Sequence, residues 1–356
     1  MFEIQTPSTA TAESPILSVV ICTYNNAAGL SETLRHLQTQ RPVPGAWEVI
    51  VVDNNCSDDT ASVVAAQAKA MPELRHVLEP RQGLMHARTC GVSTSRGQIV
   101  AFVDDDNYLS EDWLAQALDF LHHHPACGAF GGTVEILWGA PPPPEIVRRA
   151  YAYAGAEMGG EARRLDGQDR WQVRGAGLVC RKAPLIASGW LDWQLCAGRV
   201  GLECMAGDDT EIVMRIARQG WEVWHVPQCK LQHAILARRI NIDYLRALHY
   251  GFGLADPLLF GLRDRGTFLR WAVRFLRFCG HRFLLWLRLW IRGWSDPEAR
   301  LEAVLVLTTL RGAMNGVAPI ARLTPIQRSL WLGQSETPSE NPPGSARAIE
   351  PAPSSS

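Results

Sequence analysis

The chain has 356 residues, of which 47% are hydrophobic, and its formal net charge is −1 at pH 7. This length can form one large domain or two moderate ones, and the near-neutral charge does not favour nucleic acid as a partner. The nine cysteines are scattered without a Cys-x-x-Cys pair, which favours reduced thiols in a cytoplasmic protein. The polar residues 1–14 are unlike a signal peptide, and no uncharged apolar run is long enough to predict a membrane-spanning helix.

The first part of the chain alternates apolar runs with segments of helical spacing. This alternation predicts a mostly parallel sheet with right-handed crossovers and helices on both faces. In such sheets, ligands bind outside the carboxyl ends of the strands. Strands are predicted at 16–22, 47–52, 74–78 and 98–103, and helices at 28–39, 58–70 and 83–95.

Polar clusters follow three of these predicted strands, at 23–26, 53–55 and Asp104–Asp106. Three adjacent carboxylates repel one another, so a positive partner is expected beside them. A divalent cation that carries a diphosphate fits this requirement. An acidic turn that caps the next helix is the alternative. Because all three clusters should converge on one crevice, we favour a binding site.

The second part of the chain is less regular. A strand is predicted at 128–136, an extended loop at the tetraproline Pro141–Pro144, and a strand at 174–180. A helix at 209–219 ends at Gly220, and a strand at 221–226 follows. We divide the chain into a flexible N-terminus (1–15), an α/β domain (16–236, with halves 16–135 and 136–236), an arginine- and aromatic-rich helical extension (237–332) and a disordered tail (333–356).

Several segments carry motifs in a fixed order: Ser18–Asn25, Val49–Thr60, Gly83–Arg88, Phe102–Asn107, Gly175–Arg181 and Gly207–Glu211. No glycine-rich dinucleotide or P-loop motif follows the first strand. The ordered series resembles the family 2 glycosyltransferases of bacterial polysaccharide biosynthesis, which are inverting enzymes. The resemblance covers about residues 16–235. It implies a GT-A-type, mostly parallel sheet sandwiched by helices, with a C-terminal helical extension.

The resemblance implies a UDP- or GDP-linked sugar as donor. A turn-forming role is the alternative for Asp53, and a surface position is the alternative for Arg88. A guanidinium at Arg88 suits a phosphate partner. The residues implied to hold the nucleotide are Thr23, Tyr24 and Asn25 at the base and ribose, Asp53 at the base or sugar, Gly83 and Arg88 beside the nucleotide, and Asp104 and Asp105 at the ribose and metal shell.

A DxD-type metal site is also implied, with Mn²⁺ or Mg²⁺ as the ion. Asp106 would bind the metal directly, with Asp104 in its shell. His233 matches the spacing of a histidine that completes the shell in many relatives, and neutral imidazole is an acceptable ligand for Mn²⁺. The alternatives are a packed core histidine at this position, or His225 as the ligand instead.

The catalytic base is expected at a helix start. Inversion by single displacement needs a base that takes the proton of the acceptor hydroxyl. The family places this base in a Glu-Asp pair, and the chain has Asp208-Asp209 at that position. We therefore predict Asp209 as the base, while aspartate in place of glutamate leaves the role of Asp208 open. Capping of the helix N-terminus is the alternative role for both.

One helical segment, 268–294, has a purely cationic face opposite aromatic residues. No acidic residue occurs between Arg265 and Trp294, which predicts docking on an anionic membrane surface. Packing of the aromatic face on the catalytic domain is the alternative. The basic residues that share the face are Arg270, Arg274, Arg277, His281, Arg288 and Arg292.

Together these patterns predict a metal-dependent inverting glycosyltransferase that moves a sugar from a nucleotide-sugar to a saccharide or lipid-linked saccharide. We expect it in the cytoplasm or on the inner face of the cytoplasmic membrane, with acceptor specificity in 137–206. A sugar-phosphate nucleotidyltransferase is disfavoured, because 23–26 lacks a glycine-rich basic loop for a triphosphate. A non-catalytic, membrane-attached binding subunit of the same fold is the second alternative.

Overall fold

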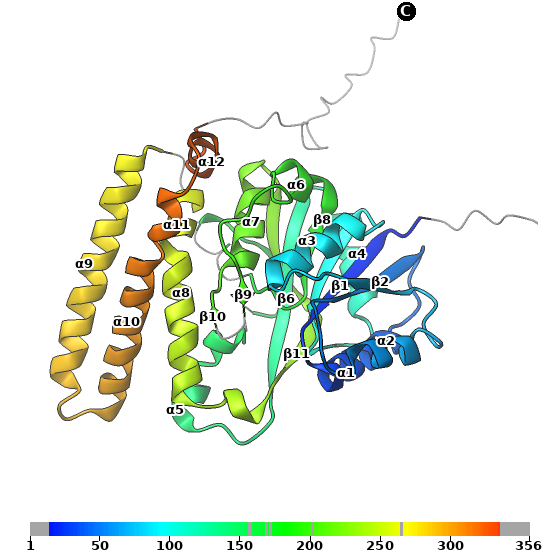
Figure 1. The fold of residues 1–356 in the computed structure, drawn as a ribbon, viewed down its shortest axis with the longest axis horizontal. Coiled ribbons are helices and arrows are strands. Elements are labelled where there is room, and N and C mark those ends of the chain that lie inside the picture. Colours follow the sequence, from blue (N-terminus) through cyan, green and yellow to red (C-terminus); the bar gives the residue numbers. More distant parts are fainter. Residues whose placement is uncertain are drawn as a thin grey trace, which may run out of the picture.

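The computed structural model describes residues 14–155, 159–167, 170, 173–200, 203–263 and 266–334. A nine-stranded sheet with helices on both faces forms its centre. A layer of long C-terminal helices stands beside the sheet (Figure 1). Most of the predicted tail 333–356 and of the N-terminal segment 1–15 lies outside the described residues.

The first half of the sheet is parallel, in the order β3-β2-β1-β4. Its strands confirm the predicted ones, and β1, β2 and β4 are buried almost throughout, as expected for strands covered on both faces, whereas the edge strand β3 is partly exposed. The strands are β1 (Leu17–Thr23), β2 (Trp47–Asp53), β3 (Leu74–Leu78) and β4 (Ile99–Asp104), and the connecting helices are α1 (Ala27–Gln38), α2 (Thr60–Gln67) and α3 (Leu84–Thr94).

The second half of the sheet is mixed and continues from β4 in the order β8-β6-β11-β5. β8 is antiparallel to both of its neighbours, whereas β6 and β11 are parallel. The elements are β5 (Asn107–Leu109), α4 (Trp113–His123), β6 (Cys127–Trp138), β7 (Arg163–Arg164), β8 (Leu178–Arg181), α6 (Lys182–Ala187), β9 (Arg199–Val200), β10 (Glu203–Cys204), α7 (Asp208–Arg218) and β11 (Glu222–Ile235).

Three sequence predictions in this half need correction. The strand predicted at 221–226 continues as β11 to Ile235, because Pro227 lies within an irregularity between His225 and Lys230 where the ladder is interrupted. The strand predicted at 174–180 begins only at Leu178, after Gly177 with its φ of +71°. Pro144 of the predicted loop is the first residue of α5 (Pro144–Val147), a position that proline tolerates because no helical N–H is needed there.

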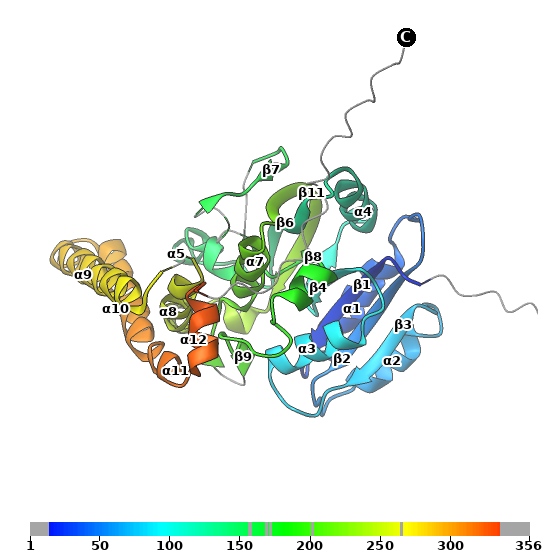
Figure 2. The same ribbon diagram turned by 90° about the horizontal axis from the view of Figure 1, so that it is seen from above.

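The C-terminal helices form a layer on one side of the sheet, with α10 between α8 and α9 (Figures 1 and 2). Small residues allow close approach of α8 and α10: a Cβ on Gly253 would lie 2.1 Å from the Thr309 carbonyl oxygen. The helices are α8 (Ile242–Arg263), α9 (Phe268–Arg292), α10 (Pro297–Asn315), α11 (Ala318–Ala321) and α12 (Pro325–Trp331).

One C-terminal segment, Pro297–Ala321, is long and apolar enough to cross a membrane by length and composition alone. No such helix was predicted from the sequence, because the segment contains charged residues. Within this segment, 44% of the apolar window is buried in the structure. The core helix of a soluble protein meets the same criteria, and this segment packs between α8 and α9.

Candidate active site

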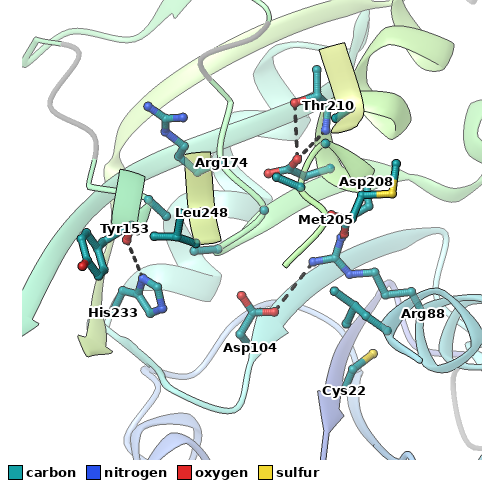
Figure 3. A pocket seen from close by; sticks show the side chains of 18 of the residues that line it. Cys22, Arg88, Asp104, Tyr153, Arg174, Met205, Asp208, Thr210, His233 and Leu248 are labelled. Carbon is teal, nitrogen blue, oxygen red and sulfur yellow. Dashed lines mark hydrogen bonds and ion pairs between the residues drawn. The ribbon is translucent and has the colours of Figure 1, made fainter. Parts of the chain in front are cut away.

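A cleft with a volume of about 490 Å³ lies at the carboxyl ends of β1 and β4 and reaches α7 and α8. The side chains that line it come from segments far apart in the sequence (Figure 3). Ten of the residues predicted for the site are among them: Thr23, Tyr24, Gly83, Arg88, Asp104, Asp105, Asp106, Asp208, Asp209 and His233.

Two predicted nucleotide residues, Asn25 and Asp53, do not line the cleft. The side-chain oxygen of Asn25 accepts a hydrogen bond of 2.7 Å from the Ser57 N–H. Asp53 Oδ1 accepts one of 2.8 Å from the Cys56 N–H. Both side chains therefore hold the loop after β2 in place, as in the turn-forming role considered for Asp53.

Asn54, a member of the polar cluster 53–55 for which no individual role was predicted, lines the cleft. Its Oδ1 accepts a hydrogen bond of 2.7 Å from the Gly83 N–H, and its Nδ2 donates 2.7 Å to the Arg81 carbonyl. Gly83 has a φ of +136°, a conformation that favours glycine. Asn54 thus fixes the loop that opens α3 at the edge of the cleft.

The carboxylate of Asp105 is held by the loop after β1. It accepts hydrogen bonds of 2.6 Å from Thr23 Oγ1 and 2.8 Å from Asn26 Nδ2. Burial, with help from the neighbouring charge of Asp106, raises the pKa of Asp105 to about 7. Two of the predicted polar clusters therefore meet directly at this edge of the sheet.

Arg88 connects the two acidic groups of the cleft. Its guanidinium forms an ion pair with Asp208, and one of its nitrogens lies 3.8 Å from Asp104 Oδ1 (Figure 3). Burial opposes the charge, but Asp208 and Asp104 raise the pKa of Arg88 above its ordinary value. Because Arg88 is buried, it is not the surface arginine that the sequence left as an alternative.

Asp208 and Asp209 occupy the first turn of α7, directly after Gly207 with its φ of +93°. Asp209 Oδ1 accepts a hydrogen bond of 2.7 Å from the Thr210 N–H. Its Oδ2 lies 3.1 Å from where a Cβ on Gly175 would be, so a side chain there would crowd the carboxylate. Burial first and the adjacent Asp208 second raise the pKa of Asp209. Acids in the first turn also suit the helix dipole, so the capping role is compatible with this geometry.

Asp106 and His233 face one another in the cleft. His233 Nε2 lies 3.4 Å from Asp106 Oδ1. On its other side, His233 Nδ1 lies 2.9 Å from the Tyr153 carbonyl oxygen, and Figure 3 shows this second contact. Since a carbonyl only accepts, Nδ1 carries a proton, and Nε2 faces the carboxylate. Such a contact needs a proton or a cation between the two atoms. The alternative His225 does not line the cleft.

These two side chains are the right donor types for Mn²⁺ or Mg²⁺, although they do not form a complete shell. Among the described residues, no group of three or more His, Cys, Asp or Glu is placed to hold a metal ion. Burial lowers the pKa of His233, but the neighbouring Asp106 outweighs it and raises the pKa above its ordinary value. Asp106 Oδ2 also accepts a hydrogen bond of 3.2 Å from Arg239.

Two further features of the cleft were missed from the sequence. Arg174 lines it, and its Nε is buried with no hydrogen-bond partner among the described residues. The other feature is a row of α8 residues on the side of the helix that faces the cleft. Their helical spacing is the same as that of residues packed in a core, so the sequence did not indicate a cleft. The α8 residues that line the cleft are Leu248, Phe252, Ala255, Asp256 and Leu259.

Comparison with known proteins identifies the family. Residues 18–157 match the family model described as glycosyl transferase family 2. The succinoglycan biosynthesis protein ExoM of Rhizobium meliloti is 32% identical over 259 residues, which cover 72% of this chain and 79% of that protein. The chain belongs to glycosyl transferase family 2. A glucosyl-dolichyl phosphate glucuronosyltransferase of Haloferax volcanii is also similar, at 27% identity over 235 residues, covering 64% of this chain and 72% of that protein.

A solved structure agrees with the predicted fold of this family 2 glycosyltransferase. The mannosyltransferase PcManGT of Pyrobaculum calidifontis, in complex with GDP-Man and Mn²⁺, has a TM-score of 0.52 at 19% identity and covers 93% of this chain and 83% of that one. The likeness confirms the mixed α/β fold with a mostly parallel sheet and a C-terminal helical region. Family membership supports a glycosyltransferase that uses a nucleotide-sugar, rather than the nucleotidyltransferase or the non-catalytic subunit.

Proposed function

We propose that the chain is a metal-dependent, inverting glycosyltransferase that uses a UDP- or GDP-sugar and transfers its sugar to a saccharide or lipid-linked saccharide. The observation that carries this proposal is that Asp104–Asp106 and the pair Asp208-Asp209 line one cleft, in which Arg88 contacts both Asp104 and Asp208. The acids after β4 would hold the donor, and the acid on α7 would activate the acceptor. The relatives named for succinoglycan biosynthesis and for transfer to a dolichyl phosphate sugar support an acceptor of this class.

The donor side would use Asp106 Oδ1 and His233 Nε2 to hold Mn²⁺ or Mg²⁺. The ion supplies positive charge that offsets the charge of the leaving diphosphate. The 3.4 Å separation of these two atoms supports this role, because a carboxylate oxygen and an imidazole nitrogen this close can bind the same ion. Asp104 and Asp105 would contact the ribose and the metal shell, and Thr23, Tyr24 and Asn54 would line the nucleoside.

The acceptor side would use Asp209 as the base. The acceptor oxygen attacks the anomeric carbon from the face opposite the diphosphate, and its proton passes to Asp209. The bond from the anomeric carbon to the phosphate oxygen breaks, and its electron pair leaves with the diphosphate. The raised pKa of Asp209 suits a base that must hold this proton. Asp208 is engaged by Arg88 and would position that guanidinium.

We also propose that α9 rests on an anionic membrane surface on the cytoplasmic side. The aromatic face of α9 divides in the structure: Phe275 is buried, whereas Phe283 and Trp290 are exposed. A third, bare face lies next to the cationic one. Its exposed apolar residues are Leu269, Val273, Leu276, Phe283, Leu284, Leu287, Trp290 and Ile291.

Release of nucleoside diphosphate from a panel of UDP- and GDP-sugars, with Mn²⁺ and water as acceptor, tests the catalytic proposal. The wild-type protein should release diphosphate slowly from at least one donor. Asp106→Ala and Asp209→Asn should lose this release. Full activity in both variants would overturn the assigned roles.

A further inference from the structure

The row of α8 residues forms the wall of the cleft across from the donor strands. In both views, α7 lies between α8 and the strands β1 and β2 (Figures 1 and 2). Leu248, Phe252, Ala255, Asp256 and Leu259 repeat at spacings that place them on one side of a helix. This wall belongs to the C-terminal helical layer, outside the segment 137–206 in which acceptor specificity was expected.

The α8 wall is adjacent to the turn that carries Asp209. A Cβ on Gly207 would lie 2.8 Å from Ala255 Cβ and 3.1 Å from Leu259 Cδ1. The backbone N–H of Ala206 lies 3.5 Å from the Gly251 carbonyl oxygen. A molecule that brings a hydroxyl to Asp209 therefore lies against this part of α8.

Asp256 gives the α8 wall a polar group available to a ligand. Among the described residues, no hydrogen bond or ion pair within 4 Å engages its carboxyl group. Burial raises the pKa of Asp256 to about 7, and Arg282 of α9, the charged group that faces it, acts in the opposite direction. Burying a carboxyl group costs free energy unless a hydrogen-bond donor replaces the water that it loses. A ligand that donates a hydrogen bond to Asp256 would therefore be stabilised.

Aromatic rings line the same cleft as this carboxyl group. Phe252 lies one helical turn before Asp256, and Tyr151 lines the same cleft with an exposed ring. A pyranose ring presents C–H groups that pack on an aromatic face and hydroxyls that hydrogen-bond to a carboxyl oxygen. Apolar and aromatic lining with few polar groups is typical of sites that orient a small ligand.

We propose that the α8 wall is the acceptor-sugar subsite, in which Phe252 packs on a neutral hexopyranose unit and Asp256 hydrogen-bonds to its hydroxyls. The assignment rests on the proposed function, because it takes Asp209 as the base. The acceptor recognised here is a hexopyranoside, whether free or lipid-linked.

Saturation-transfer NMR of the full-length protein with p-nitrophenyl glucoside, galactoside and mannoside tests this subsite. At least one hexoside should receive saturation at its ring protons in the wild-type protein. Binding should weaken about tenfold in Asp256→Asn and Phe252→Ala, as expected for loss of a charge-assisted hydrogen bond or of aromatic packing. Asp243→Asn makes the same chemical change at a side chain of α8 that is 91% exposed, and should bind as the wild type does.

Donor hydrolysis separates the two proposals. The wild type and Asp243→Asn should release nucleoside diphosphate at the same rate with water as acceptor, and circular dichroism shows whether Asp256→Asn and Phe252→Ala are folded. If the wild type releases none from any donor, the proposed function fails. If release is normal but no hexoside binds, or the hexosides bind equally to wild type and both α8 variants, the subsite is overturned.

Discussion

Asp106 and His233 lie side by side because β5, which begins directly after Asp106, pairs with β11 and sets His233 opposite Asn107. The Ala234 N–H also donates a hydrogen bond of 2.8 Å to the Asp106 carbonyl oxygen. The backbone of the acidic run is thus tied to the strand that carries the histidine. The geometry of the proposed metal site therefore depends on a strand of only three residues.

Substitution of the proposed metal ligands should weaken Mn²⁺ binding. We expect Asp106→Asn and His233→Gln each to reduce Mn²⁺ affinity at least about tenfold, because each removes a donor atom. Electron paramagnetic resonance of free Mn²⁺, titrated with the full-length protein and UDP or GDP, measures this change.

His225→Gln provides the control, since His225 lies on the same strand but does not line the cleft. It should bind Mn²⁺ as the wild type does. Donor hydrolysis that survives removal of divalent ions by EDTA would contradict a metal-dependent reaction.

Substitution of the base should reduce transfer without loss of nucleotide binding. Asp209→Asn removes the proton acceptor but keeps the size of the side chain, so we expect the rate to fall about 10²–10⁴-fold. Calorimetry with UDP or GDP should give an unchanged affinity. Asp208→Asn should affect both quantities, because it also releases Arg88, which reaches Asp104. If Asp209→Asn retains the wild-type rate, another group is the base.

The pH below which the rate falls should depend on the pKa of Asp209. Burial and Asp208 raise the pKa of Asp209, whereas Arg88 and Arg174 lower it. A base works only when deprotonated, so the rate should fall about tenfold per pH unit below this raised pKa. Arg174→Met removes one lowering charge, so the pKa rises further and the acid limb moves to higher pH.

Arg246→Met is the control for this experiment, because Arg246 is half-exposed on α8 and pairs with Asp243. Its pH–rate profile should coincide with that of the wild type. The comparison uses initial rates of diphosphate release at saturating donor. An acid limb that stays in place in Arg174→Met would show that Arg174 does not act on the base.

The parts of the fold that could be predicted are those set by local sequence. The apolar runs that form β1, β2 and β4 are nearly continuous and end in polar turn residues, and the acids of α7 follow a glycine. β5 is too short to give a pattern, and β11 continues through Pro227 because an irregularity removes the need for its N–H. Both features were missed, although together they position His233.

The missed parts of the site depend on contacts between distant segments. Arg88 was predicted to lie beside the nucleotide, but its ion pair with Asp208 was not, because only the fold brings α3 to the start of α7. The residues of α8 have the spacing of a core helix, and the spacing does not reveal which side faces a cleft. Conversely, Asn25 and Asp53 lie in recognisable motifs but serve the loop after β2.

A charge on the bare face of α9 should abolish membrane binding. Leu276 is 68% exposed on this face, so Leu276→Glu should cost little stability while placing a carboxylate in the lipid interface. In flotation with vesicles of phosphatidylglycerol and phosphatidylcholine, the wild type should float and the variant should remain at the bottom.

Ile326→Glu is the matched control, because Ile326 is 74% exposed on α12, outside α9. It should float with the wild type. High salt should release the wild type, since each arginine near an anionic surface contributes about 1 kcal/mol that salt screens. Equal flotation on neutral vesicles would contradict the role of the cationic face.

Loss of Glu211 should strongly destabilise the fold around α7. Its carboxylate is fully buried, accepts hydrogen bonds from the N–H groups of Leu195 and Cys196, and lies 2.8 Å from an Arg215 nitrogen. We expect Glu211→Ala to lower the free energy of unfolding by about 3–5 kcal/mol, because it leaves a buried charge unpaired. Urea unfolding followed by circular dichroism measures the change.

Glu32→Ala serves as the comparison, since Glu32 pairs with Arg35 on the surface and such pairs contribute about 0–1 kcal/mol. Its midpoint in urea should stay close to that of the wild type. Similar midpoints for the two variants would mean that the buried network does not support α7.

Helix α8 has the cleft on one side and the helices α9 and α10 on the other. A chain that ended at residue 236 would keep every proposed donor ligand and the proposed base, but it would lack a wall of the cleft. The proposed donor site and the proposed acceptor subsite therefore come from separate stretches of sequence. Exchanging α8 between relatives offers a way to change the acceptor of the sugar while keeping the same donor.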